Sequence, residues 1–155
     1  NYPCIMFRCV DQENNLIGRD VLPDEISYLE MVNNTYDEMF GIYKREVFIS
    51  SFFVDKIEKL RRFESIAIFN MLKNFGSLKV INQAIRIYHT DNDDRLCTPA
   101  NLRYQSCAMA KGHFYTLQIF WRAMKLKKII HTFVKIISYS LYCVYISTYK
   151  MIKFT

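Results

Sequence analysis

The last 61 residues of the chain contain no aspartate and no glutamate. Residues 95–155 carry 10 lysines and arginines, whereas residues 1–94 carry 11 of them together with all 15 acidic residues, and the whole chain is +6. An acid-free stretch of this length favours an anionic partner, either nucleic acid or a lipid surface. The alternative is that the basic part neutralises the acidic part within one fold.

Glycine, proline and cysteine are also scarce. Four glycines and three prolines among 155 residues exclude collagen-like and low-complexity sequence. Five cysteines are too few for a small scaffold held together by disulfides. Since 51% of the residues are apolar, a wholly disordered chain is excluded as well, and the length suits one globular domain.

Catalytic and metal-binding motifs are missing. The chain has no Gly-x-Ser-x-Gly nucleophile elbow, no phosphate-binding Walker loop and no Gly-x-Gly-x-x-Gly. Asp91, Asp93 and Asp94 begin like a calcium-binding EF-hand loop, but the fifth, sixth and twelfth positions lack the oxygen ligand, the glycine and the glutamate. We therefore predict a non-enzymatic protein with no catalytic residue, metal, cofactor or small-molecule substrate.

Apolar residues recur at steps of three and four along most of the chain, which is typical of amphipathic helices. Helices are expected from Pro23 to about Val47, from Ser50 or Ser51 to a stop at Gly76, from Ser77 to about His89, and from Asn101 through Ile129. Residues 1–23 are expected to be irregular and residues 90–101 to form a loop. The predicted fold is all-α, a bundle of four to five helices with a basic, aromatic-rich C-terminal segment.

The predicted division is a helical bundle over residues 1–128 and an apolar, basic segment over residues 129–155. Within that segment, residues 136–149 form an uncharged run of 14 residues between two lysines. A helix that crosses a membrane needs about 20 apolar residues. The segment is therefore either the last helix of the bundle, a membrane-surface or tail-anchor segment, or a strand or poorly ordered tail.

Cations and aromatic residues cluster on both sides of the predicted boundary between residues 128 and 129. We expect an anionic surface, with a membrane as the favoured one, to be bound by Arg122, Lys125, Lys127, Lys128 and Lys135. The residues expected to insert into the membrane are Tyr139, Leu141, Tyr142, Val144 and Tyr145. The partner is then anionic lipid or another protein. Nucleic acid is a further alternative, because lysines interleaved with tyrosine and phenylalanine also suit stacked bases.

A secreted four-helix, cytokine-like signalling protein is the second hypothesis. The size, a start at Asn1 that indicates a processed chain or a fragment, and a glycosylation sequon at Asn33 support it. Disulfides would join Cys4 to Cys97 or Cys9 to Cys107. Residues 64–75 and 104–108 resemble stretches of type I interferons, but they cover 17 residues, lie too close together and are followed by Met109 where that family has tryptophan. The family is not assigned, and the compartment is either membrane-associated or secreted.

Overall fold

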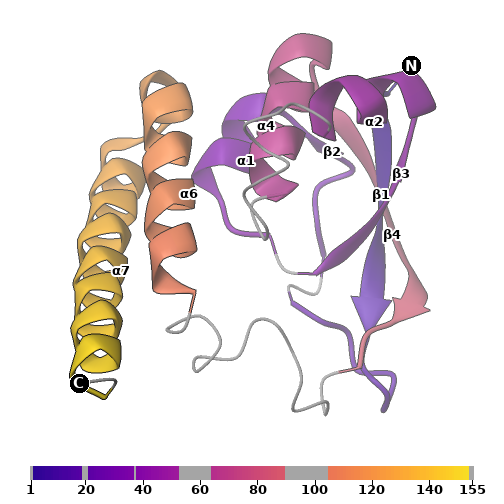
Figure 1. The fold of residues 1–155 in the computed structure, drawn as a ribbon. Coiled ribbons are helices and arrows are strands. Elements are labelled where there is room, and N and C mark those ends of the chain that lie inside the picture. The colour runs from indigo at the N-terminus through magenta and orange to yellow at the C-terminus, as the bar shows by residue number, and fades with distance from the viewer. Residues whose placement is uncertain (1, 19–20, 37, 53–63, 90–104, 154–155) are drawn as a thin grey trace. The chain divides into compact units, whose positions relative to one another are not determined.

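The computed structural model of the chain describes residues 2–18, 21–36, 38–52, 64–89 and 105–153. The chain divides into two compact units, Asn1–Asn92 and Asp93–Thr155. We refer to them as unit 1 and unit 2. Figure 1 shows the helices and strands of both units.

Unit 1 is built on a mixed sheet of four strands in the order β2-β4-β1-β3. The strands are β1 (Cys4–Val10), β2 (Glu25–Ile26), β3 (Met39–Tyr43) and β4 (Leu78–Ile87). The central pair, β1 and β4, is parallel, and the strands at both edges run antiparallel to their neighbours. A parallel central pair requires a crossover connection, and here that connection contains both edge strands as well as helices.

The helices of unit 1 are α1 (Tyr28–Asn33), α2 (Arg45–Phe52) and α4 (Glu64–Phe75). A capping box begins α1, because the Ser27 hydroxyl accepts from the Glu30 backbone N–H while the Glu30 carboxylate accepts from the Ser27 N–H. Gly76 follows the end of α4 with a φ of +97°, a left-handed conformation that glycine adopts without a steric cost. The predicted helix stop at Gly76 is therefore confirmed.

The sheet shows that the predicted all-α bundle is wrong, because unit 1 is a mixed α/β fold. β4 replaces the helix expected from Ser77, and β1 lies in the segment expected to be irregular. The helix expected from Pro23 to Val47 is instead β2, α1, β3 and the start of α2. Short apolar runs fit the period of a helix as well as that of a strand. Here the pairing of strands that are distant in the sequence makes these runs strands.

One face of the sheet forms the core of unit 1, and Figure 1 shows α1 and α4 on one side of it. The buried residues of β1, β4 and α4 include Cys4, Met6, Leu78, Val80, Ile66, Ala67 and Met71. On the other face of β1 and β3, Ile5 and Ile42 pair across the strands and both remain exposed. These two positions on the second face of the sheet are thus apolar and exposed.

A break in register between β1 and β4 ties the loop after β1 to the sheet. Phe7 pairs with Ile81 but Arg8 pairs with Ala84, so the intervening residues of β4 bulge out of the ladder. One of them, Asn82, accepts from the Leu22 backbone N–H at 3.0 Å and donates to the Leu22 carbonyl at 2.8 Å. Its carbonyl oxygen also accepts from the buried Arg8 guanidinium at 3.4 Å. The Asn82 side chain therefore pairs with both backbone groups of Leu22, as the backbone of a neighbouring strand would.

The change Asn82→Ala should lower the free energy of unfolding of unit 1 by about 1–3 kcal/mol, because it leaves both backbone groups of Leu22 without this partner. Chemical denaturation followed by far-UV circular dichroism measures the effect. Gln83→Ala is the matched control, since this neighbour lies in the same bulge and is exposed. Equal losses in the two variants would contradict a specific role for Asn82.

Unit 2 is described from Gln105 onward and consists of α6 (Ser106–Phe120), the short 3-10 helix η1 (Trp121–Ala123) and α7 (Leu126–Lys153). α7 is 28 residues long and continuous, so residues 129–153 are helical and the strand alternative for this segment does not hold. Between the two long helices the chain reverses at η1, and α6 and α7 form an antiparallel hairpin (Figure 1). We call residues 106–153 the C-terminal hairpin.

Candidate functional site

A disulfide between Cys107 and Cys143 closes the C-terminal hairpin. Cys107 is the second residue of α6, and Cys143 lies in the second half of α7, with 5.0 Å between the two Cα atoms. The bond fixes the rotation of α7 about its own axis, because the side that carries Cys143 must face α6. Neither predicted pairing occurs: Cys107 bonds a cysteine of its own hairpin, Cys4 and Cys9 are buried free thiols of β1, and Cys97 lies outside the described residues.

Loss of this disulfide should destabilise the C-terminal hairpin by about 4 kcal/mol, which is the chain-entropy value for a sequence separation of 36 residues. Thermal unfolding followed by Trp121 fluorescence measures it, since Trp121 is the single tryptophan of the chain and lies in η1. A reducing agent should lower the melting temperature of the native chain and leave the Cys107→Ser/Cys143→Ser variant unchanged. A native chain insensitive to reduction would rule out the bond.

The side of α7 that carries Cys143 also carries the residues that contact α6. Thr132 is buried, and its hydroxyl donates to the Lys128 carbonyl at 2.8 Å. Tyr139 is half-buried and stacks on the His113 ring of α6, with 5.7 Å between the ring centroids and 15° between the ring planes. These residues follow one another at steps of about one or two helical turns, as a single contact side requires.

An apolar stripe runs along a different side of α7. We define it as Leu126, Ile130, Phe133, Val134, Ile137, Leu141, Val144 and Tyr145. Every member is exposed, from 47% at Ile137 to 72% at Leu126. The steps of three and four residues place all eight on one face of the helix. A continuous exposed apolar surface of this kind marks an interaction site.

The predicted membrane-inserting residues divide between the two sides. Leu141, Val144 and Tyr145 belong to the apolar stripe, and Tyr142 lies beside it at 39% exposure. Tyr139 instead faces α6 through its stack with His113. The five upstream members of the stripe were not predicted as inserting residues, although their spacing continues the same helical period toward the N-terminus of α7.

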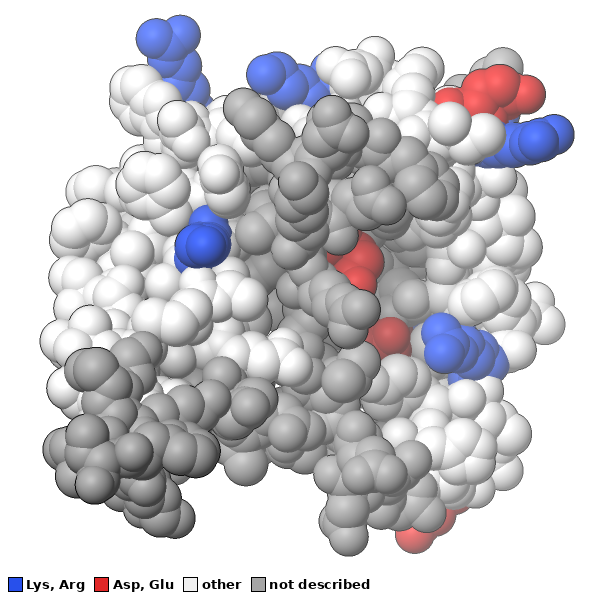
Figure 2. Space-filling view, viewed as in Figure 1, with Lys and Arg blue, Asp and Glu red and all other residues white. Residues whose placement is uncertain are grey.

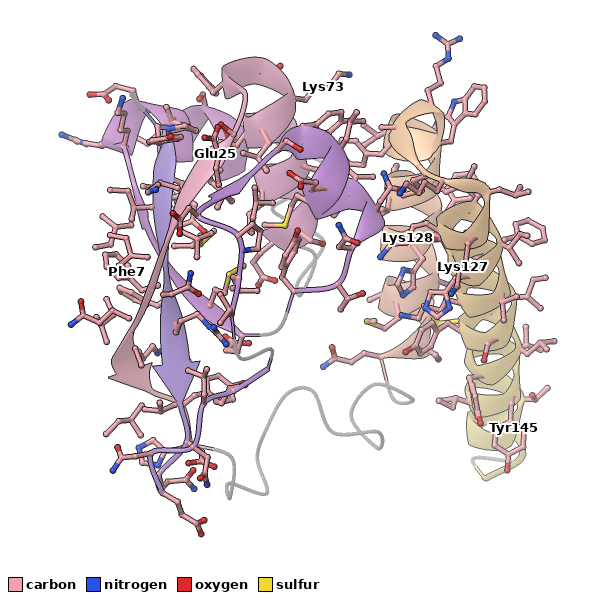
Figure 3. All side chains as sticks on the ribbon, turned by 180° about the vertical axis from the view of Figure 1, so that it is seen from behind. Phe7, Glu25, Lys73, Lys127, Lys128 and Tyr145 are labelled. Carbon is pink, nitrogen blue, oxygen red and sulfur yellow. A yellow bond between two sulfur atoms is a disulfide. The ribbon has the colours of Figure 1, made fainter. Side chains whose placement is uncertain are left out.

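The predicted anion-binding cations differ in their exposure. Arg122 of η1, Lys125 and Lys127 are exposed near the start of α7, with the Arg122 guanidinium 5.3 Å from the Trp121 ring centroid. Lys128 and Lys135 are half-buried. Figure 3 shows Lys127 and Lys128 close to one end of α7 and Tyr145 toward the other end.

The half-buried cations crowd around His113. Burial, and after it the positive charges of Lys135, His131 and Lys128, together lower the pKa of His113 to about 4. Burial and then Lys135 likewise lower the pKa of Lys128. His131 is exposed, and chiefly the charge of Lys135 lowers its pKa. At neutral pH the His113 imidazole is therefore uncharged.

The stability of the C-terminal hairpin should fall as the pH falls from about 6.5 to about 4. In that window the unfolded chain binds a proton at His113 that the folded hairpin does not bind, so protonation favours unfolding. Urea unfolding followed by Trp121 fluorescence across this range gives the slope. In His113→Gln the slope should be shallower, with the remainder due to His131; an unchanged slope would show that His113 titrates normally.

Among the described residues, α7 is the helix that is long and apolar enough to cross a membrane. The segment Leu126–Ile146 has 21 residues and a mean hydropathy of 1.5, with 6% of it buried. This property reflects length and composition. It agrees with the exposed apolar stripe on the same helix.

A shallow groove of about 350 Å³ lies between the two helices of the hairpin. Its lining is mainly apolar and consists of Ala110, Lys111, Phe114, Tyr115, Ile136 and Ser140. On the part of the hairpin that is visible in Figure 2, most side chains are uncharged, a few are cations and none is a carboxylate. The groove therefore adds to the apolar character of the hairpin.

Two other candidate positions lie in unit 1. Asn33, the predicted glycosylation site, is the last residue of α1, and its side-chain amide donates to the Leu29 carbonyl at 2.8 Å. Burial raises the pKa of the Cys4 thiol to about 12, so this cysteine is an unreactive core residue. The residues that the structure describes contain no cluster of three or more His, Cys, Asp or Glu side chains able to hold a metal ion.

No family model, curated protein or solved structure matches the chain. The C-terminal hairpin, with its exposed apolar stripe and its cations, is therefore the candidate functional site.

Proposed function

We propose that the protein is a non-enzymatic, membrane-associated protein whose C-terminal hairpin binds an anionic lipid surface. α7 lies along the surface, and its apolar stripe inserts between the lipid head groups. The observation that carries the proposal is the stripe itself, eight apolar side chains on one face that α6 does not cover. Interfacial helices have this arrangement of one apolar face beside a basic polar face.

The charge of the hairpin supports an anionic lipid surface over a neutral one. Residues 95–155 contain no acid, and the described helices of unit 2 carry only cations. Arg122, Lys125 and Lys127 lie near the start of the stripe and are exposed to contact head groups. Each such cation contributes about 1 kcal/mol near an anionic surface, so the three give about 3 kcal/mol.

The apolar stripe contributes the larger share of binding. A fully buried Leu, Ile, Val or Phe side chain gains about 1.5–3 kcal/mol, and seven members of the stripe are of these types. Partial insertion of several of them exceeds the electrostatic contribution. Binding should therefore survive high salt, unlike attachment through surface charge alone.

The position of Lys135 favours a helix that lies on the membrane over one that crosses it. This residue is near the middle of Leu126–Ile146, and the uncharged run after it, residues 136–149, has 14 residues. A crossing needs about 20 apolar residues, and a cation at the centre of a bilayer is costly. In the interfacial arrangement the cations remain at head-group level while the stripe points inward.

The alternative hypotheses have less support. A cytokine-like protein required a four-helix bundle, and unit 1 has a mixed sheet instead. Nucleic-acid binding uses the cations of the hairpin but leaves the apolar stripe without a role. A second copy of the chain would cover the stripe but would bring cations together without acids from this hairpin.

Replacing two stripe residues, in Leu141→Ser/Val144→Ser, should weaken flotation of the full chain with anionic vesicles at least tenfold, because about 3–6 kcal/mol of apolar burial is at stake when insertion is complete. Ile42→Ser/Ile85→Ser makes the same chemical change at exposed positions of unit 1 and should float like the native chain.

The proposal fails if the native chain does not float with anionic vesicles, or if both double variants float equally well. A stable dimer in light scattering that the stripe variant dissociates would assign the stripe to a second copy. Binding to RNA that is lost at high salt, without any flotation, would favour the nucleic-acid alternative.

A further inference from the structure

β3 forms one edge of the sheet of unit 1, since the strand order within the described residues is β2-β4-β1-β3. Proteins protect such edges with short strands, charged side chains or proline, because a row of outward backbone groups pairs readily with another chain. The opposite edge is protected in this way: β2 has only two residues, and one of them is Glu25. β3 has five residues, Met-Phe-Gly-Ile-Tyr, with neither a charge nor a proline. β3 therefore has the composition of a strand that pairs on both sides.

The ladder with β1 determines which backbone groups of β3 point to the edge. Lys44 donates its backbone N–H to the Pro3 carbonyl at 3.1 Å, in line with the antiparallel register of β1 and β3. In such a ladder every second residue directs both its N–H and its C=O to the partner strand. Ile42 therefore faces β1 as Lys44 does, whereas Met39 and Gly41 direct their backbone groups toward the edge.

The residues around Gly41 are complementary to themselves. When a second copy of β3 is placed antiparallel with Gly41 opposite Gly41, Phe40 lies opposite Ile42 and Glu38 lies opposite Lys44. Both charged residues are exposed and stand directly before and after β3. Opposite charges and apolar side chains that face each other across two strands stabilise their pairing. A twofold axis through Gly41 repeats every one of these contacts, as the symmetry of a dimer requires.

We propose that β3 pairs with β3 of a second copy of the chain, antiparallel and centred on Gly41, so that two sheets become one continuous sheet. The charges select this register. Centring the pair on Phe40 would place Glu38 opposite Ile42, and centring it on Ile42 would place Lys44 opposite Phe40. In both cases a charge would face an apolar side chain. The dimer does not rest on the proposed membrane function, because it uses unit 1 alone.

The side chains that meet in this pairing lie on the second face of the sheet. Within unit 1, Phe40 pairs with Phe7 and Ile42 pairs with Ile5, and Figure 3 shows Phe7 on the side of β1 away from α1 and α4. Ile42 is 52% exposed, and the Phe40 ring lies 5.7 Å from the Arg86 guanidinium. Because Phe40 and Ile42 direct their backbone groups to β1, they form pairs without backbone hydrogen bonds between the two copies. Such pairs bring side chains closest together, so Phe40 of one copy covers Ile42 of the other.

Sedimentation equilibrium of the full chain tests for the dimer, and reversal of single charges tests its register. Glu38→Lys brings like charges together at positions 38 and 44, at both ends of the symmetric pairing, and Lys44→Glu does the same with two acids. Each variant should weaken the dimer by about tenfold. Lys73→Glu makes the same change at an exposed position of α4 and should leave the dimer unchanged.

Restored charge complementarity should restore the dimer. The variant Glu38→Lys/Lys44→Glu exchanges the two charges and should dimerise like the native chain. A mixture of the two single variants should form a dimer at a concentration at which each variant alone is monomeric, because a chain with two bases then meets a chain with two acids. A folding defect in either single variant would not be repaired by mixing.

The stripe variant, Leu141→Ser/Val144→Ser, should dimerise like the native chain, since its changes lie in unit 2. A native chain that is still monomeric at about 1 mM would overturn the proposal. So would single reversals that dimerise like the native chain, or a mixture no more dimeric than its components. A dimer that the stripe variant alone dissociates would assign the contact to the stripe and reject pairing through β3.

Discussion

The disulfide between Cys107 and Cys143 decides which side of α7 meets α6, and the character of the other sides follows from that choice. A helix of 28 residues buries one side against a single neighbouring helix and leaves the rest outside that contact. With Cys143 facing α6, Thr132 and Tyr139 face it as well. The most apolar side of α7 is then outside the packing of the hairpin. An apolar surface of this length is stable only against another apolar phase or in a position where water is excluded.

The same rotation of α7 also leaves basic side chains half-buried near its contact with α6. In an ordinary amphipathic hairpin the apolar sides meet and the charged sides face water. Here Lys128, Lys135 and His113 lie half-buried near the contact, while the apolar stripe is exposed. The proposed lipid surface suits this inverted arrangement, because it has an apolar interior and negative charge at its edge. A lipid surface combines both properties, whereas a nucleic acid offers only the negative charge and an apolar protein face offers only the apolar surface.

The sheet of unit 1 was not predictable from local patterns for a physical reason. In β4, Val80, Ile81, Ala84 and Ile85 satisfy the steps of a helix as well as those of a strand. The buried residues Leu78 and Val80 begin a strict alternation, but the bulge at Asn82 interrupts it. The strand is stabilised by β1, more than 60 residues earlier in the chain, and no local window contains that pairing. Gly76 was predictable because its left-handed conformation depends on the preceding helix alone.

Some residues of the candidate site are related by the geometry of one helix, and others only by the packing of two helices. The apolar stripe lies on one helix, so helical geometry alone relates its members, and the sequence was sufficient to predict three of them, Leu141, Val144 and Tyr145. The roles of Tyr139 and Cys143 depend on which side of α7 faces α6, and that rotation is a property of two helices. His113 stacks on Tyr139 only because α6 packs against that side of α7. The exposed apolar stripe can therefore be predicted from the period of one segment, whereas the contacts between α6 and α7 require the packed hairpin.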